Sequence, residues 1–228
     1  AELYAYGTAA TVNTTTPKYL EATPFIPPYQ AAVPGHYNTE IQITRGFWMV
    51  SWFKEQFGHP EQQRASVLGG IPEQFFDELI EAVAPGADGL MLQPYWSPGV
   101  REPGPEARGA VIGWGDGHTR AHSYRAIVEG IAYGLRQGLE RMEARAGVKG
   151  RALRVAGGGS QSDGAMQITA DIFNRPAERL AEYEASGLGA AMNVAVAVGW
   201  HKDHAAAVAA MTRVARRFEP MPAEDERY

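Results

Sequence analysis

The feature that most limits the fold is a long helical pattern in the second half of the chain. From Thr119 to Ala146, apolar residues recur every three or four positions, and Gly147 supplies a stop. A hydrophobic strand over Ala152–Ala156, a run of glycines and a helix over Ser162–Phe173 follow. This alternation of helices and strands predicts an α/β domain with a mixed sheet covered by helices.

Two periodicities predict the remaining elements, a period of two for strands and a period of three to four for helices. We expect strands over Glu2–Val12, Glu40–Thr44, Gly89–Tyr95 and residues 177–183. We expect helices over Arg45–Phe57, Ile71–Val83, Ser186–Trp200 and Asp203–Phe218.

Composition excludes several classes of function. The chain has no cysteine, which rules out disulfide scaffolds, thiol nucleophiles and cysteine zinc sites. Lys and Arg number 21 against 26 for Asp and Glu, giving a net charge of −5, so no basic face for nucleic acid or anionic lipid is expected. No apolar run approaches the roughly 20 residues of a membrane span, and no charged-then-apolar leader opens the chain. We therefore expect a cytoplasmic protein without nucleic-acid or membrane partners.

Three glycine-bearing turns are candidates for a phosphate site. Gly157-Gly158-Gly159 links a strand to a helix, where glycine lets a ligand approach the backbone and the helix N-terminus attracts negative charge. Gly7-Thr8 interrupts the first strand pattern and adds a hydroxyl, and Gly117 precedes the long helix. Each is also compatible with an ordinary tight turn. The spacing fits neither a Walker A loop nor the dinucleotide fingerprint.

Other chemistries have weaker support. His118 and His122 have the spacing of metal ligands on a helix, but no third ligand of matching geometry is visible. Asp116 is better explained as a residue that favours the helix N-terminus. No Gly-x-Ser-x-Gly sequence is present, so a hydrolase triad has no support. We therefore assign no catalytic residue and no metal ligand in this chain.

The separate signals occur in an order that resembles a known family. The series comprises Gly7-Thr8, Pro94-Tyr95, Arg101-Glu102, Ala107-Arg108-Gly109, Arg125-Ala126, Glu129 to Ala132, Gly157-Gly158-Gly159, Gln167, Ala170-Asp171, and Gly187 to Ala191. It resembles the C-terminal domain of the FGGY family of carbohydrate kinases, which includes glycerol kinase, xylulokinase and ribulokinase. The resemblance covers essentially the whole chain.

The resemblance implies an actin-like ATPase with ribonuclease-H-type folds on either side of a cleft. ATP with Mg²⁺ then binds largely to the C-terminal domain, and the sugar binds largely to the N-terminal one. Gly7-Thr8 matches the phosphate-contacting turn, and Gly117 matches the glycine before the long helix. Within Gly157-Gly158-Gly159, Gly158 matches the glycine that lies against adenosine. Ser162 stands where glycerol kinase has an adenine-contacting Asn, so this contact is the least certain to carry over.

One family residue has no counterpart here. The aspartate that takes the proton from the sugar hydroxyl lies upstream of the Gly-Thr turn, and no Asp precedes Thr8. The resemblance thus implies that residues 1–228 form the C-terminal domain of a longer kinase whose N-terminal sugar-binding domain lies outside this chain. We expect Ala1 to be an internal residue and the chain alone to be inactive.

Two classes of function follow from this reading. The first is ATP-dependent phosphoryl transfer to a sugar or polyol hydroxyl by the full-length protein, with this chain as its nucleotide-binding half. The alternative is a non-catalytic actin-like module that binds nucleotide to regulate a partner. A domain with no ligand would be indicated if packing occluded residues 157–162. We also expect possible homo-oligomers, because Glu2–Val12 is predicted to be an uncovered edge strand.

Overall fold

The computed structural model describes residues 2–99, 103–147, 149–221 and 228. A seven-stranded mixed sheet has the order β3-β4-β2-β1-β7-β8-β9, and a separate two-stranded sheet pairs β5 with β6. The strands are β1 Glu2–Tyr6, β2 Ala10–Thr16, β3 Tyr29–Gln30, β4 Tyr37–Ile43, β5 Met91–Gln93, β6 Ala110–Ile112, β7 Leu153–Ala156, β8 Ala177–Leu180 and β9 Val214–Phe218.

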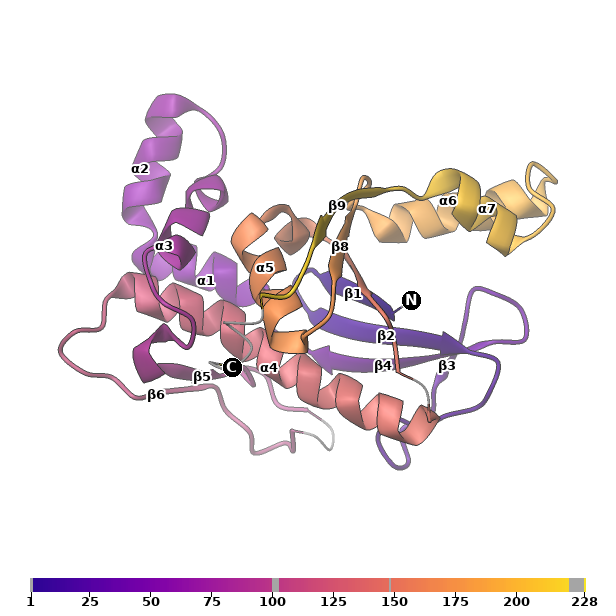
Figure 1. The fold of residues 1–228 in the computed structure, drawn as a ribbon, viewed down its shortest axis with the longest axis horizontal. Helices are drawn as coiled ribbons and strands as arrows, with labels where there is room; N and C mark the ends of the chain where they lie inside the picture. Colours follow the sequence, from indigo (N-terminus) through magenta and orange to yellow (C-terminus); the bar gives the residue numbers. More distant parts are fainter. Residues whose placement is uncertain (1, 100–102, 148, 222–227) are drawn as a thin grey trace.

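Helices cover one face of the large sheet and extend beyond its ends (Figure 1). They are α1 Trp48–Phe57, α2 His59–Leu68, α3 Asp77–Glu81, α4 Arg120–Ala146, α5 Asp163–Phe173, α6 Ala185–Ala197 and α7 His204–Met211. Short 3-10 turns are η1 Pro72–Phe75, η2 Ala87–Gly89 and η3 Gly158–Gln161. Helix α4 packs on β2 and β4, while α5 packs on β8 and β9.

The pairing pattern makes β1 the centre of the sheet. Strand β1 runs antiparallel to β2 and parallel to β7, and β7 runs parallel to β8. An antiparallel meander of β1, β2 and β4 therefore joins parallel strands that are reached through helical crossovers. This arrangement confirms the predicted α/β class with a mixed sheet covered by helices.

Helix α4 carries the core, as its sequence pattern predicted. Its inward face includes the fully buried Ile131, Leu135 and Leu139. A Cβ at Gly138 would stand 2.3 Å from Ile41 Cγ2, so glycine is needed there for α4 to lie this close to β4. The helix ends at Gly147, which has a left-handed φ of 66°.

The prediction of one strand over Glu2–Val12 is wrong. The segment forms two strands around a tight turn, in which the Gly7 N–H donates to the Ala9 carbonyl at 3.0 Å. Because β2 and β7 flank β1 on both sides, it is not an edge strand. Self-association through an exposed β1 edge is therefore excluded. The edges are β3 and β9.

The predicted helix over Asp203–Phe218 is also wrong at its second half. Helix α7 stops at Met211, and residues 214–218 form β9, antiparallel to β8, with Phe218 opposite Ala177. Local sequence favours helix in the alanine-rich run, but pairing with β8 and burial of Phe218 decide the last five residues.

Smaller differences occur near α1. The predicted helix over Ile71–Val83 is divided into η1 and α3 at Phe76. Helix α2 and strand β6 are not predicted from the sequence. For α2 the reason is that the helix is mostly polar and buries only Glu61 and Ala65. Among the described residues, none of the helices is both long enough and apolar enough to cross a bilayer.

Candidate functional site

The structure brings two of the three glycine turns together. Strands β1 and β7 are parallel neighbours with Ala5 opposite Ala156, so Gly7-Thr8 and Gly157-Gly158-Gly159 leave the same edge of the sheet side by side. We call these five residues the strand-end cradle. Loops at the carboxyl ends of parallel strands are the usual position of ligand sites in α/β sheets.

Two cradle glycines are required by packing. Gly157 has a φ of 88°, and a Cβ there would lie 2.7 Å from the Tyr6 carbonyl oxygen. A Cβ on Gly159 would lie 2.4 Å from Phe47 Cδ1. Gly158 differs, because nothing lies within 4 Å of its Cβ position. The middle glycine therefore presents its backbone to open space.

An aromatic pair forms the floor of the strand-end cradle. The rings of Tyr6 and Phe47 stack with centroids 4.3 Å apart, and the Tyr6 hydroxyl is 2.5 Å from Thr169 Oγ1. Burial raises the pKa of Tyr6, so its hydroxyl stays neutral. On the other side, the Trp48 N–H donates to the Thr8 carbonyl at 3.2 Å, which fixes the start of α1 against the turn.

Ser162 is the N-cap of α5 and its hydroxyl is largely occupied. It accepts from the Ala165 N–H at 3.0 Å and donates to Asp77 Oδ1. Asp77 also accepts from the Asp163 N–H at 2.8 Å. A hydroxyl has one proton and two lone pairs, so Ser162 retains a single accepting position. In any contact with adenine, the Ser162 hydroxyl could therefore only accept a hydrogen bond from the base.

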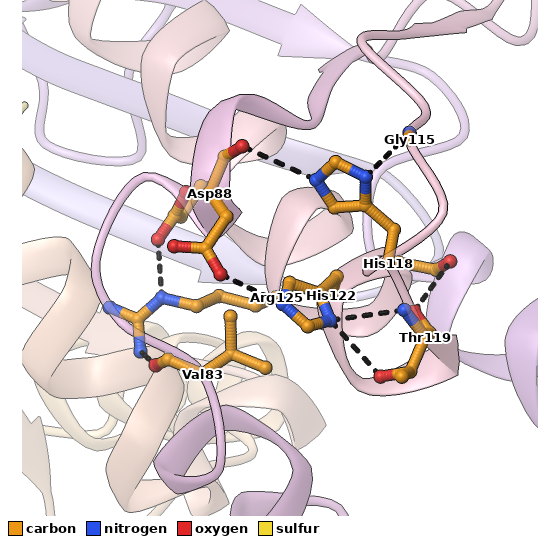
Figure 2. Close-up of polar contacts among 9 residues, drawn as sticks. Val83, Asp88, Gly115, His118, Thr119, His122 and Arg125 are labelled. Carbon is orange, nitrogen blue, oxygen red and sulfur yellow. Dashed lines mark hydrogen bonds and ion pairs between the residues drawn. The ribbon is translucent and has the colours of Figure 1, made fainter.

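The third glycine turn lies at the start of α4, where two imidazoles hold it (Figure 2). We call residues 113–119 the imidazole turn. The Gly115 N–H donates to His118 Nδ1 at 2.7 Å, and the Thr119 N–H donates to His122 Nδ1 at 3.1 Å. Gly117, inside the turn, has nothing within 4 Å of its Cβ position.

Asp88 lies on the other side of both imidazoles. His118 Nε2 is 3.3 Å from the Asp88 carbonyl oxygen, and His122 Nε2 is 3.1 Å from Asp88 Oδ2. Asp88 belongs to an unusual run, because Gly86, Ala87, Asp88 and Gly89 all have positive φ. Ala and Asp rarely adopt this conformation, so surrounding contacts must hold it in place.

A buried ion pair anchors the same run to α4. Arg125 Nε donates to Glu129 Oε1 at 2.6 Å, and Glu129 accepts from the Gly86 N–H at 3.1 Å. Arg125 also donates to the carbonyls of Ile80 and Val83, at 3.0 and 2.9 Å. Burial raises the pKa of Glu129, while the Arg125 charge acts in the opposite direction.

One segment connects the predicted site residues that the sheet does not bring together. Asp77 holds Ser162 at one end of this segment, and Asp88 holds the imidazole turn at the other. Helix α3, inside the segment, packs against both α4 and α5. Gly117 is therefore linked to the cradle side through residues 77–88 rather than by direct contact in the described interactions.

Sequence reasoning missed Asp77 and Asp88. Neither lies in a recognisable motif, and each bonds to residues far along the chain, with Ser162 85 positions from Asp77 and His122 34 positions from Asp88. The spacing of His118 and His122 was noted in the sequence, but it was assigned no metal site because no third ligand was visible. Among the described residues, no group of three or more His, Asp or Glu could hold a metal ion.

A cavity of about 700 Å³ opens beside the left-handed run. It is lined by Gly86, Asp88, Leu92, Glu129 and Tyr133 among others, and by none of the cradle residues. The hydroxyl of Tyr228 donates to Glu129 Oε1 at 3.0 Å at its wall. This cavity is therefore separate from the strand-end cradle.

The mixed sheet with glycine turns at its parallel strand ends defines the chain as an α/β domain. The protein-family comparison identifies the family within this class. Residues 3–198 match the model of the FGGY family of carbohydrate kinases, C-terminal domain. The chain therefore belongs to the FGGY family and corresponds to its C-terminal domain.

Curated relatives agree with this assignment. The chain is 37% identical to the sugar kinase YgcE of Escherichia coli over 82% of this chain and 37% of the relative. It is 42% identical to glycerol kinase of Dechloromonas aromatica over 84% and 36% of the two chains. It is 32% identical to xylulose kinase of Lactococcus lactis over 99% and 44%. The chain thus spans less than half the length of these relatives.

Solved structures confirm the fold. Xylulose kinase from Rhodospirillum rubrum matches with a TM-score of 0.80 at 26% identity, over 100% of this chain and 44% of that one. Plasmodium falciparum glycerol kinase, solved with ADP, matches with a TM-score of 0.74 at 19% identity, over 99% and 44%. The actin-like ATPase architecture implied by the sequence is therefore confirmed.

Proposed function

We propose that this chain is the nucleotide-binding half of an ATP-dependent kinase that phosphorylates a hydroxyl of a sugar or polyol. The observation that carries the proposal is the position of Gly7-Thr8 beside Gly157-Gly158-Gly159, in a chain of the FGGY family. Two turns with small side chains, at the ends of adjacent parallel strands, allow a polyphosphate to approach the backbone closely.

The residues present fit a nucleotide. Gly158 and Gly117 both face open space, so the backbone at each turn can be reached without moving a side chain. The strand-end cradle leads into the N-terminus of α5, and the imidazole turn leads into that of α4, so both regions favour negative charge. A Cβ at Gly158 would fill the space that the ligand requires.

Magnesium would be bound through the nucleotide. Because the described residues offer no cluster of three side-chain ligands, Mg²⁺ is expected as a complex with the phosphates and water. When bound, it neutralises charge on the phosphates. The chain itself orients the polyphosphate with backbone groups of the strand-end cradle and excludes water with the Tyr6–Phe47 floor.

The acceptor and its general base belong to the part of the enzyme outside this chain. We propose that residues 1–228 work as the C-terminal domain of a longer kinase, since the chain spans less than half of its relatives. Glycerol, a ketopentose, an aldonate and other polyols are equivalent candidates for the acceptor. A cytoplasmic location, homo-oligomers and inactivity of the chain alone stay predictions.

Calorimetry with MgATP tests the nucleotide site directly. We expect weak binding by this chain, because one wall of the cleft is absent, and at least a tenfold loss in Gly158→Val. Gly187→Val is the matched control, since Gly187 in α6 also has nothing within 4 Å of its Cβ position. Equal binding by the two variants would contradict the assignment of the strand-end cradle.

Catalysis needs a second experiment with the chain joined to a sugar-binding half. Phosphorylation of one member of a sugar and polyol panel is the expected outcome. Nucleotide binding without transfer to any acceptor would instead favour the non-catalytic regulatory module.

A further inference from the structure

The hydrogen bonds of the imidazole turn define the protonation state of both rings. Each Nδ1 faces a backbone N–H, of Gly115 for His118 and of Thr119 for His122. A nitrogen that accepts a hydrogen bond carries no proton, so each neutral ring has its proton on Nε2. This agrees with the Nε2 atoms, which face oxygens of Asp88.

We propose that His118 and His122 are positioning residues for the nucleotide, and that their protonation releases the imidazole turn and weakens nucleotide binding. This inference rests on the proposed function, because it concerns the regulation of the same site. The two rings act on the ligand only through the backbone that they hold.

Proton uptake reverses the role of Nδ1. An imidazolium donates from both nitrogens, so a protonated His118 turns an N–H towards the Gly115 N–H and loses the bond. For His122 the same loss opens the capping box with Thr119, although the Asp88 carboxylate offsets part of it. His118 Nε2 faces the carbonyl of Asp88 rather than its carboxylate, so this carboxylate does not offset the bond that a protonated His118 loses.

The charged groups around the rings leave Asp88 as the carboxylate that faces them. Arg120, next to Thr119, is held by Glu61 of α2 at 2.7 Å and by the Phe57 carbonyl. Arg125, one turn further along α4, is held by Glu129. Asp116 lies within the turn itself, and its described contacts do not include either ring.

The two imidazoles also contact each other, and His118 contacts the uncharged ring of Trp114. Trp114 meets His118 edge-on with centroids 5.9 Å apart, and the two imidazoles meet at 90° with centroids 5.2 Å apart.

The closed turn is what presents Gly117. The His118 N–H donates to the Gly115 carbonyl at 3.2 Å while the His118 ring accepts from the Gly115 N–H, so one residue closes the turn from both sides. Gly117 lies between these two residues and before the first N–H groups of α4.

Matched variants can separate protonation from shape. His118→Asn places an amide oxygen near the position of Nδ1, and His122→Gln supplies the residue that normally completes a capping box with Thr119. Neither replacement titrates. The double variant therefore keeps the accepting groups and removes the proton-dependent change.

The experiment measures MgADP affinity by calorimetry from pH 8 to pH 5.5 for this chain and for the double variant. Protonation of the nucleotide phosphate is common to both proteins. We expect this chain to lose about fivefold more affinity than the variant over this range. Parallel pH profiles would overturn the inference alone, whereas absence of binding by both proteins at pH 8 would overturn the proposed function and the inference with it.

A second readout does not depend on nucleotide. Two-bond nitrogen–proton NMR spectra of the imidazoles distinguish the tautomers, and we expect the Nε2–H form for His118 and His122 at pH 8. An Nδ1–H form of His118 would overturn the inference. Thermal unfolding of the double variant and of His118→Asn alone verifies that each is folded during the binding measurement.

Discussion

The strand-end cradle and the imidazole turn both present a glycine to open space, but they are held in different ways. Around Gly158 the backbone is fixed by close packing, since the flanking Gly157 and Gly159 leave no room for a Cβ. Around Gly117 the backbone is fixed by hydrogen bonds that the N–H groups of Gly115 and Thr119 donate to imidazole side chains. The first region is held by close packing, and the second is held by hydrogen bonds to two imidazoles.

The two regions therefore differ in what it takes to move them. Packing against Tyr6 and Phe47 can be removed only by changing volume. The hydrogen bonds that His118 and His122 accept from the backbone would be removed by a proton on Nδ1. Substitutions in the two regions should therefore change stability and nucleotide binding by different amounts.

The largest expected effect on stability comes from breaking the buried ion pair between Arg125 and Glu129. Arg125→Met should lower the free energy of unfolding by about 3 kcal/mol, because it leaves Glu129 and two buried carbonyls without their partner. Chemical denaturation measures this loss. Arg136→Met is the control, since Arg136 pairs with Glu140 at the same spacing on α4 but is half-exposed and donates to one carbonyl, of Ile172, so its loss should cost less than that of Arg125.

The next effect concerns the cradle. Gly157→Ala should destabilise the chain by about 2 kcal/mol, because it combines a positive φ with a contact of 2.7 Å to backbone. Gly158→Ala should change stability by less than about 0.5 kcal/mol. Equal losses in the two variants, measured by denaturation, would show that packing does not distinguish these neighbouring glycines.

The elements that the sequence predicts correctly are those with a strong local periodicity of apolar residues. Helix α4 and the strand, glycine run and helix that follow it were predicted correctly, because their periodicity is strong and their ends carry stop signals. Strand β9 was not, because its pairing with β8 is a tertiary contact that overrides an alanine-rich sequence. Helix α2 was missed because its sequence has no apolar face.

The site was predictable only where backbone chemistry defined it. Glycines at strand ends were visible in the sequence, and their assignment as a nucleotide site remains a prediction. Asp77, which holds Ser162, and Asp88, which holds the two imidazoles, were invisible, because a carboxylate that bonds across the fold leaves no local pattern.

A smaller effect is expected at the cap of α5. Ser162→Ala removes the bond from the Ala165 N–H and should lower stability by about 1 kcal/mol. Ser162→Asn, which restores an accepting oxygen at the N-cap, should recover most of it. Thermal unfolding of both variants tests this. A loss in Ser162→Asn as large as that in Ser162→Ala would mean that the hydroxyl bond to Asp77 dominates.

The destabilisation caused by Arg125→Met should itself depend on pH. Burial raises the pKa of Glu129, and Arg125 is the first partner that opposes this, so Arg125→Met should raise it further. A carboxyl whose pKa is higher in the folded state than in the unfolded state contributes stability at low pH that is lost as pH rises. The destabilisation by Arg125→Met should therefore increase from acid to neutral pH. A destabilisation that is constant across this range would contradict the role given to Glu129.

The central claim is that the strand-end cradle and the imidazole turn bind one nucleotide together. Titration of the ¹⁵N-labelled chain with MgADP tests it, because backbone amide resonances report weak binding residue by residue. The account predicts that the amides of Thr8, Gly158 and Gly117 shift together with one dissociation constant. Shifts confined to one region, or to neither, would contradict it.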